Sequence, residues 1–88
     1  MKLDIDIPEY DNEGTDVIWE KDSKINISYD EYSAYICANK EGLISLAKQL
    51  LYFAYNDFPD GVHVHYDDFF CDLENGSKEL IIERKDDI

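Results

Sequence analysis

Basic residues are scarce in this sequence. Eight lysines and arginines stand against twenty-one acidic residues, which gives a formal net charge of −13. Such a surface repels the phosphates of nucleic acids and anionic membranes, and it accelerates encounters with basic proteins. We therefore expect no nucleic-acid partner and no membrane partner. The acids are concentrated in the two flanks, because residues 1–38 and 57–88 each hold ten acids and three bases.

Long hydrophobic runs are also missing. No apolar run approaches the roughly 18 residues that a membrane-spanning helix needs. The first residues, MKLDIDIPEYD, turn acidic at once, so we expect no signal peptide and a cytoplasmic location. Cys37 and Cys71 are too few for a disulfide framework and lack metal-type spacing. We interpret both as reduced, structural cysteines.

Catalytic motifs are absent too. The sequence contains no glycine-rich phosphate loop and no G-x-S-x-G nucleophile elbow. Its 88 residues make one small domain, residues 1–88, with little room for a deep, protein-walled cavity. These observations favour a binding surface over an enzyme, and we predict no catalytic residues, no metal and no cofactor.

One long helix is predicted after Asn39. Asn39 is a favoured N-cap residue, and Glu41 in the first turn complements the helix dipole. Gly42 lets the backbone approach a neighbouring sheet, and Pro59 ends the segment. The periodicity predicts an apolar face of Leu43, Ile44, Leu46, Ala47, Leu50, Leu51, Phe53 and Ala54. The predicted polar arc holds Ser45, Lys48, Gln49, Tyr52, Tyr55 and Asn56.

Six strands are predicted around this helix, four before it and two after. Their sequences are KLDIDIP, DVIWE, KINISY, YSAYICA, GVHVHY and KELIIERK, in chain order. This order has no βαβ rhythm and predicts an α+β fold, a mostly antiparallel sheet of about six strands with the helix packed on one face. An exposed edge strand is able to pair two copies, so the sequence leaves open a monomer or a homodimer.

The segment HVHYDD, residues 63–68, allows several interpretations. In a strand, Val62, Val64 and Tyr66 share the inner face, and His63, His65 and Asp67 face outward. Two histidines at this spacing suit a metal, but zinc needs a third protein ligand, which Asp67 or Asp68 would have to supply. We favour two solvent-facing histidines and keep a small metal-binding protein or enzyme as the alternative.

Surface recognition is the remaining class of function. The segment HYDDFFCDLE interleaves acids with aromatic residues. Either Phe69 and Phe70 cap the core while the acids are solvated, or the segment meets a cationic, partly apolar partner surface. Tyr52 lies at the centre of the predicted polar arc, where an exposed tyrosine would anchor an interface. The predicted partner-binding residues are Tyr52, His63, His65, Asp67, Asp68 and Asp72.

Three pieces of the sequence resemble a family of small immunity proteins from bacterial polymorphic toxin systems. They are the helix start NKEGLISLAKQLL, the strand HVHYD and the closing strand GSKELIIERK. The resemblance implies a non-enzymatic protein that binds and blocks a cognate toxin domain, often a nuclease. It also adds weight to His63, His65 and Asp67, which belong to the matching motif. A further alternative is an acidic DNA-mimic or anti-nuclease protein with no toxin of its own.

Overall fold

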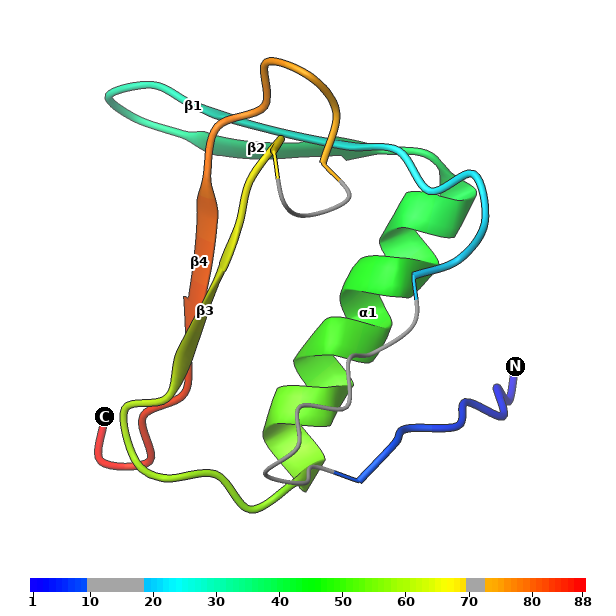
Figure 1. Cartoon of the computed structure of the whole chain (residues 1–88), viewed down its shortest axis with the longest axis vertical. Helices are drawn as coiled ribbons and strands as arrows, with labels where there is room; N and C mark the ends of the chain where they lie inside the picture. Colours follow the sequence, from blue (N-terminus) through cyan, green and yellow to red (C-terminus); the bar gives the residue numbers. More distant parts are fainter. Residues whose placement is uncertain (10–18, 70–72) are drawn as a thin grey trace.

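The computed structural model describes residues 1–9, 19–69 and 73–88. Along them run the strands and helix β1 (Ile25–Tyr29), β2 (Ala34–Ala38), α1 (Lys40–Tyr55), β3 (His63–Tyr66) and β4 (Leu80–Glu83). The predicted α+β class is confirmed. In Figure 1 the β1–β2 hairpin crosses one end of the molecule, and α1 and the β3–β4 hairpin extend from it as two sides.

The strands form two separate antiparallel pairs instead of one sheet. Ile25 of β1 lies opposite Ala38 of β2, and His63 of β3 lies opposite Glu83 of β4. The predicted sheet of about six strands is therefore wrong. Residues 1–9 form no strand. In the predicted strand DVIWE, residues 16–18 lie outside the described residues, and Trp19 and Glu20 are not in a strand.

Irregular chain occupies the edge of β1 where a further strand would pair. The amide of Glu74 donates to the carbonyl of Ile25 at 2.8 Å, and the amide of Lys78 donates to the carbonyl of Ile27 at 2.8 Å. The amide of Ile27 donates to Ser77 Oγ at 2.8 Å. Alternating hydrophobicity predicts which side chains share a face, but it does not reveal that a loop takes the backbone partners.

The start of α1 is formed as predicted. Asn39 Oδ1 accepts hydrogen bonds from the amides of Gly42 at 2.8 Å and Lys24 at 2.9 Å, so it caps the helix and ties it to the chain entering β1. A Cβ on Gly42 would lie 2.5 Å from the Lys24 carbonyl oxygen. The predicted close approach of backbone at this glycine is confirmed.

The predicted apolar face of α1 is wrong in orientation. The buried residues of α1 are Gly42, Ser45, Leu46, Gln49, Tyr52 and Phe53, whereas Leu43, Ile44 and Leu50 are exposed. The helix is rotated by about a third of a turn from the prediction. Buried polar groups find partners, which favours this orientation. Ser45 Oγ accepts from the Glu20 amide at 2.8 Å, and Gln49 Oε1 accepts from the Tyr66 hydroxyl at 2.9 Å.

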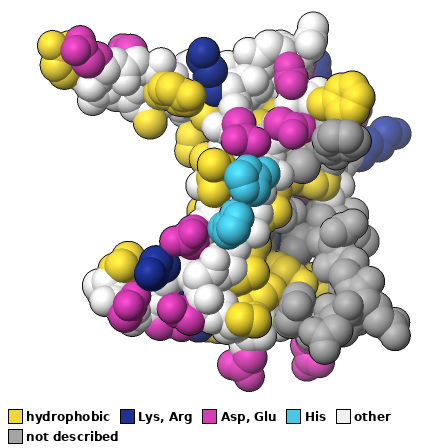
Figure 2. Space-filling view, turned by 60° about the vertical axis from the view of Figure 1, so that its left-hand side comes forward, with side chains coloured by type: hydrophobic (Ala, Val, Ile, Leu, Met, Phe, Trp, Pro, Cys, Tyr) yellow, Lys and Arg dark blue, Asp and Glu magenta, His cyan; other side chains and the backbone are white. Residues whose placement is uncertain are grey.

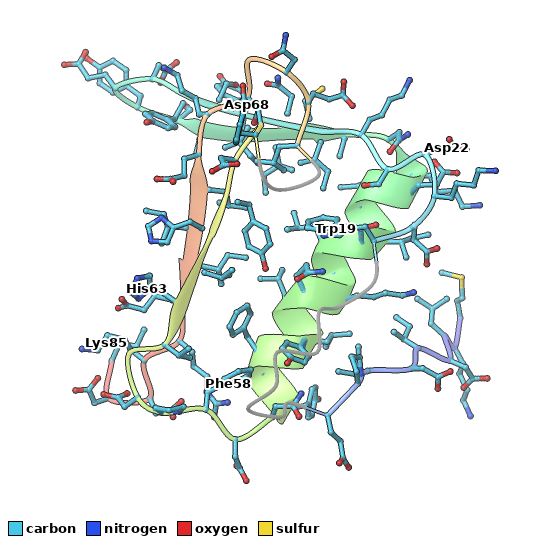
Figure 3. The ribbon with its side chains drawn as sticks, in the orientation of Figure 1. Trp19, Asp22, Phe58, His63, Asp68 and Lys85 are labelled. Carbon is cyan, nitrogen blue, oxygen red and sulfur yellow. The ribbon has the colours of Figure 1, made fainter. Side chains whose placement is uncertain are left out.

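The core lies where α1 and both hairpins meet. Its buried members are Ile25, Ile27, Leu46, Tyr66 and Leu73, and the partly buried residues packed against them are Trp19, Ala38, Val64, Leu80 and Ile82. Trp19 meets Tyr66 edge to face, with ring centroids 5.7 Å apart, and points into the space between helix and sheets (Figure 3). None of the described residues belongs to a helix with the length and hydrophobicity that crossing a bilayer requires.

A second contact joins the end of α1 to the end of β4. Arg84 Nη1 donates to the carbonyls of Phe53 at 2.9 Å and Asn56 at 2.5 Å. These carbonyls belong to the last turn of α1 and its C-cap, where carbonyl groups have no partner within the helix. The Arg84 charge also complements the negative end of the helix dipole. Arg84 thereby fixes the end of the β3–β4 hairpin to the C-terminal end of α1.

Candidate partner-binding face

The outer face of the β3–β4 hairpin presents both histidines to solvent. Val64 and Tyr66 point inward and are at least partly buried, whereas His63 and His65 are exposed. This is the alternation that the sequence predicts. Figure 3 shows His63 on the side of the hairpin away from α1. The solvent-facing interpretation of the two histidines is confirmed.

Two glutamates from the β4 side lie beside these histidines. His63 Nδ1 is 3.9 Å from Glu83 Oε1, and His65 Nδ1 is 3.3 Å from Glu79 Oε2. The two imidazole rings are edge to face, with centroids 5.1 Å apart. His63 Nδ1 also lies 3.4 Å from the Gly61 carbonyl oxygen.

Strand pairing places Ile81 in the middle of this face. Its Cα partner in β3 is His65, and its side chain is 52% exposed. Glu79, Ile81 and Glu83 were missing from the sequence-based list of binding residues. Their spacing of two in KELIIER puts them on one face of a strand. Pairing the last two predicted strands would therefore have found them.

Asp67 and Asp68 follow β3 and organise the chain after it. Asp67 Oδ1 accepts from the Phe69 amide at 2.9 Å, and Asp68 Oδ2 accepts from the Gly76 amide at 2.9 Å. Gly76 has a φ of 85°, a conformation that glycine adopts readily. Both carboxylates thus hold loop backbone after the strand that carries the histidines. Asp72 lies outside the described residues.

Tyr52 does not belong to this surface. The expectation that it is exposed is wrong, because only 7% of it is accessible. Its ring packs edge to face against Phe53 and Phe58, with centroids 5.9 and 5.4 Å away. The rotation of α1 described above brings it inward, and the exposed tyrosine at this end of the helix is Tyr55.

The arrangement suits recognition of a charged protein surface. Figure 2 shows the two histidines side by side in a recessed part of the surface, with acidic side chains above and below them. Half-exposed imidazoles and carboxylates offer hydrogen-bond acceptors and, on the carboxylates, negative charge. Among residues 1–9, 19–69 and 73–88, no three His, Cys, Asp or Glu side chains are grouped as metal ligands.

The family model of immunity protein 32 matches residues 34–85. The chain belongs to this family. The match to the immunity protein 32 family covers β2, α1, β3 and β4, and so includes the whole β3–β4 face. The resemblance seen in the sequence, to an immunity-protein family of toxin systems, is confirmed. No curated protein and no solved structure matches the chain.

Proposed function

We propose that this protein neutralises a cognate bacterial toxin domain by binding it and occluding its surface. The observation that carries the proposal is the match to the immunity protein 32 family, which spans most of the regular structure. In this function the protein acts as a stoichiometric inhibitor in the cytoplasm and turns over no substrate. A compact chain with an exposed polar face is sufficient for that role.

We propose that the cognate toxin domain is basic and that it is a nuclease. Nucleases bind phosphate backbones through lysine and arginine side chains, so their substrate sites are positively charged. An inhibitor with a net charge of −13 is attracted to the same surface. The attraction raises the rate of encounter and opposes the approach of nucleic acid to the covered site.

The proposed contact residues on the β3–β4 face are His63, His65, Glu79, Ile81 and Glu83. Ile81 supplies exposed apolar area, and the glutamates supply charge. Asp67 and Asp68 adjoin this face and keep their proposed role, as does Asp72 in the same acidic segment. Burial removes Tyr52 from the set, because a side chain packed against Phe53 and Phe58 presents little surface to a partner.

Co-expression tests the proposal directly. The toxin domain encoded beside this protein is placed under an inducible promoter in a host that lacks the pair. Induction alone is expected to stop growth, and induction together with this protein is expected to restore it. A catalytically inactive toxin domain should then co-purify with the protein at equal stoichiometry. Continued killing in the presence of the folded protein would remove the proposal.

A further inference from the structure

The hairpin between β1 and β2 carries a cluster of exposed tyrosines at its tip. We call Tyr29–Tyr35 the tyrosine arm. Figure 1 shows it reaching beyond the β3–β4 hairpin, and Figure 2 shows hydrophobic and acidic side chains at the end of this projection. Tyr32 is 89% exposed, and Tyr29 and Tyr35 are more than half exposed. Aromatic rings at this exposure contribute little to the core.

The turn of the tyrosine arm is held in a defined shape. Asp30 Oδ1 accepts hydrogen bonds from the amides of Tyr32 and Ser33, each at 2.8 Å. The Asp30 amide donates to the Ser33 carbonyl at 2.9 Å. An aspartate that accepts from the amides two and three residues further along the chain stabilises a turn. The exposed rings therefore stand on an ordered backbone, and a partner that binds them pays little to order the loop.

The chemistry of the tyrosine arm indicates a cationic partner. Asp30 and Glu31 are its charged residues, and it contains no base. The face of a tyrosine ring also attracts ammonium and guanidinium groups. One such contact is present within the chain, because Lys78 Nζ lies 5.6 Å from the centroid of the Tyr29 ring. The arm thus combines two carboxylates with ring faces that suit lysine and arginine.

We propose that the tyrosine arm is a second docking element, which inserts into a cationic, partly apolar cleft of the toxin domain. This inference rests on the proposed function and adds a surface that the sequence motif did not include. The arm borders the recessed surface that holds the histidines (Figure 2). A convex partner seated in that recess would meet the arm and the β3–β4 face together.

A second copy of the chain fits the tyrosine arm less well. Each copy carries a net charge of −13, and two arms placed together would bring their carboxylates into proximity. Like charges at an interface oppose association. A basic toxin surface offers the opposite charge to Asp30 and Glu31, and its lysine and arginine side chains offer cations to the rings.

The test is a titration of a catalytically inactive form of the neighbouring toxin domain with arm variants. The double variant Tyr32→Ser/Tyr35→Ser is expected to weaken binding at least about 30-fold, the effect of losing one interface hot spot. The matched control is Tyr55→Ser, a tyrosine that is 79% exposed at the end of α1. It should bind within about twofold of the parent. Circular dichroism and thermal unfolding should show both variants folded, since the mutated rings are exposed.

Charge is tested separately with Glu31→Lys against Asp57→Lys, two exposed acids on the arm and after α1. Only the first is expected to weaken binding markedly. If the parent does not bind the toxin, the proposed function itself fails. If the parent binds and both arm variants bind equally well, the function stands and the inference is overturned. Light scattering is also measured on the protein without toxin. If the molar mass of the arm variants differs from that of the parent, the arm mediates self-association, and the inference is overturned.

Discussion

Gly42 stands where the first turn of α1 touches the chain entering β1, and it has no room for a side chain. The nearest atoms to a Cβ there would be the Lys24 carbonyl oxygen, Ile25 Cγ1 and Asn39 Oδ1. Two of these atoms take part in fixing the helix start, because Lys24 O accepts from the Asn39 amide and Asn39 Oδ1 caps the helix. Because Gly42 has no side chain, the first turn of α1 is able to pack against the chain entering β1.

We expect Gly42→Ala to destabilise the protein. Helix propensity alone favours alanine by up to about 1 kcal/mol, but overpacking against backbone costs about 1–3 kcal/mol. The clash is with a carbonyl that cannot rotate away, so the net free energy of unfolding should fall by about 1–2 kcal/mol. Urea denaturation measures it. Ala47→Gly, at an exposed helix position, is the control for propensity alone. A more stable Gly42→Ala protein would contradict the packing described here.

The histidine pair gives a second prediction at this scale. Replacing His63 and His65 with alanine should weaken toxin binding about tenfold or more, because both side chains lie at the centre of the proposed face. Stability should change little, since each ring is about half exposed. Calorimetric titration and thermal unfolding separate these effects. Unchanged affinity in the folded double variant would move the contact surface elsewhere.

Single residues also explain why the buried face of α1 could not be predicted. Ser45 and Gln49 count as polar in any periodicity analysis, yet both are buried. Each is bonded to a residue distant in sequence, Glu20 for Ser45 and Tyr66 for Gln49. The sequence does not reveal such partners, whereas the N-cap role of Asn39 depends on neighbours three residues away and was predictable.

Among the secondary-structure elements, α1 depends on β4 at its C-terminal end. Arg84 donates to carbonyls of Phe53 and Asn56, and no basic residue lies in the last turn of the helix itself. The cationic partner that a helix end favours comes instead from the end of a strand. Through this contact the end of β4 is joined to the C-terminal end of α1, and both elements lie in the segment that matches the family.

We expect Arg84→Met to lower the free energy of unfolding by about 1–2 kcal/mol, since it removes charged hydrogen bonds to helix carbonyls while keeping an apolar stem. Hydrogen exchange should quicken first at the amides near Phe53. Lys85→Met is the matched control, because Lys85 is more exposed than Arg84 and its ion pair is with the exposed Asp87, at 3.8 Å. Equal stability of the two variants would show that Arg84 does not support the helix end.

The predicted strands divide into those that form in the structure and those that do not. Within residues 1–9, 19–69 and 73–88, all four strands coincide with predicted ones, because hairpin partners share an alternating pattern. The segment KLDIDIP has the same alternation but forms no strand. Alternating hydrophobicity is a property of a single segment, whereas a strand also needs the unoccupied edge of another strand to pair with. On β1 that edge is bonded to Glu74, Ser77 and Lys78.

For the whole molecule, charge dominates the expected behaviour toward a partner. With a net charge of −13, attraction to a basic toxin extends over roughly 10 Å at 0.1 M salt and about 3 Å at 1 M. The association rate should therefore fall at least about tenfold from low to high salt, while the dissociation rate changes much less. Stopped-flow measurements over a salt series check this. A rate that is independent of salt would exclude electrostatic steering.

The ordered but unburied turn of the tyrosine arm has a consequence for how such a protein adapts. Its rings lie outside the core, and its shape depends on the bonds that Asp30 makes locally. Replacing Glu31, Tyr32 or Tyr35 therefore leaves folding nearly untouched. In the proposed docking role, substitutions at these positions change which toxin domain the protein binds and keep the folded scaffold intact.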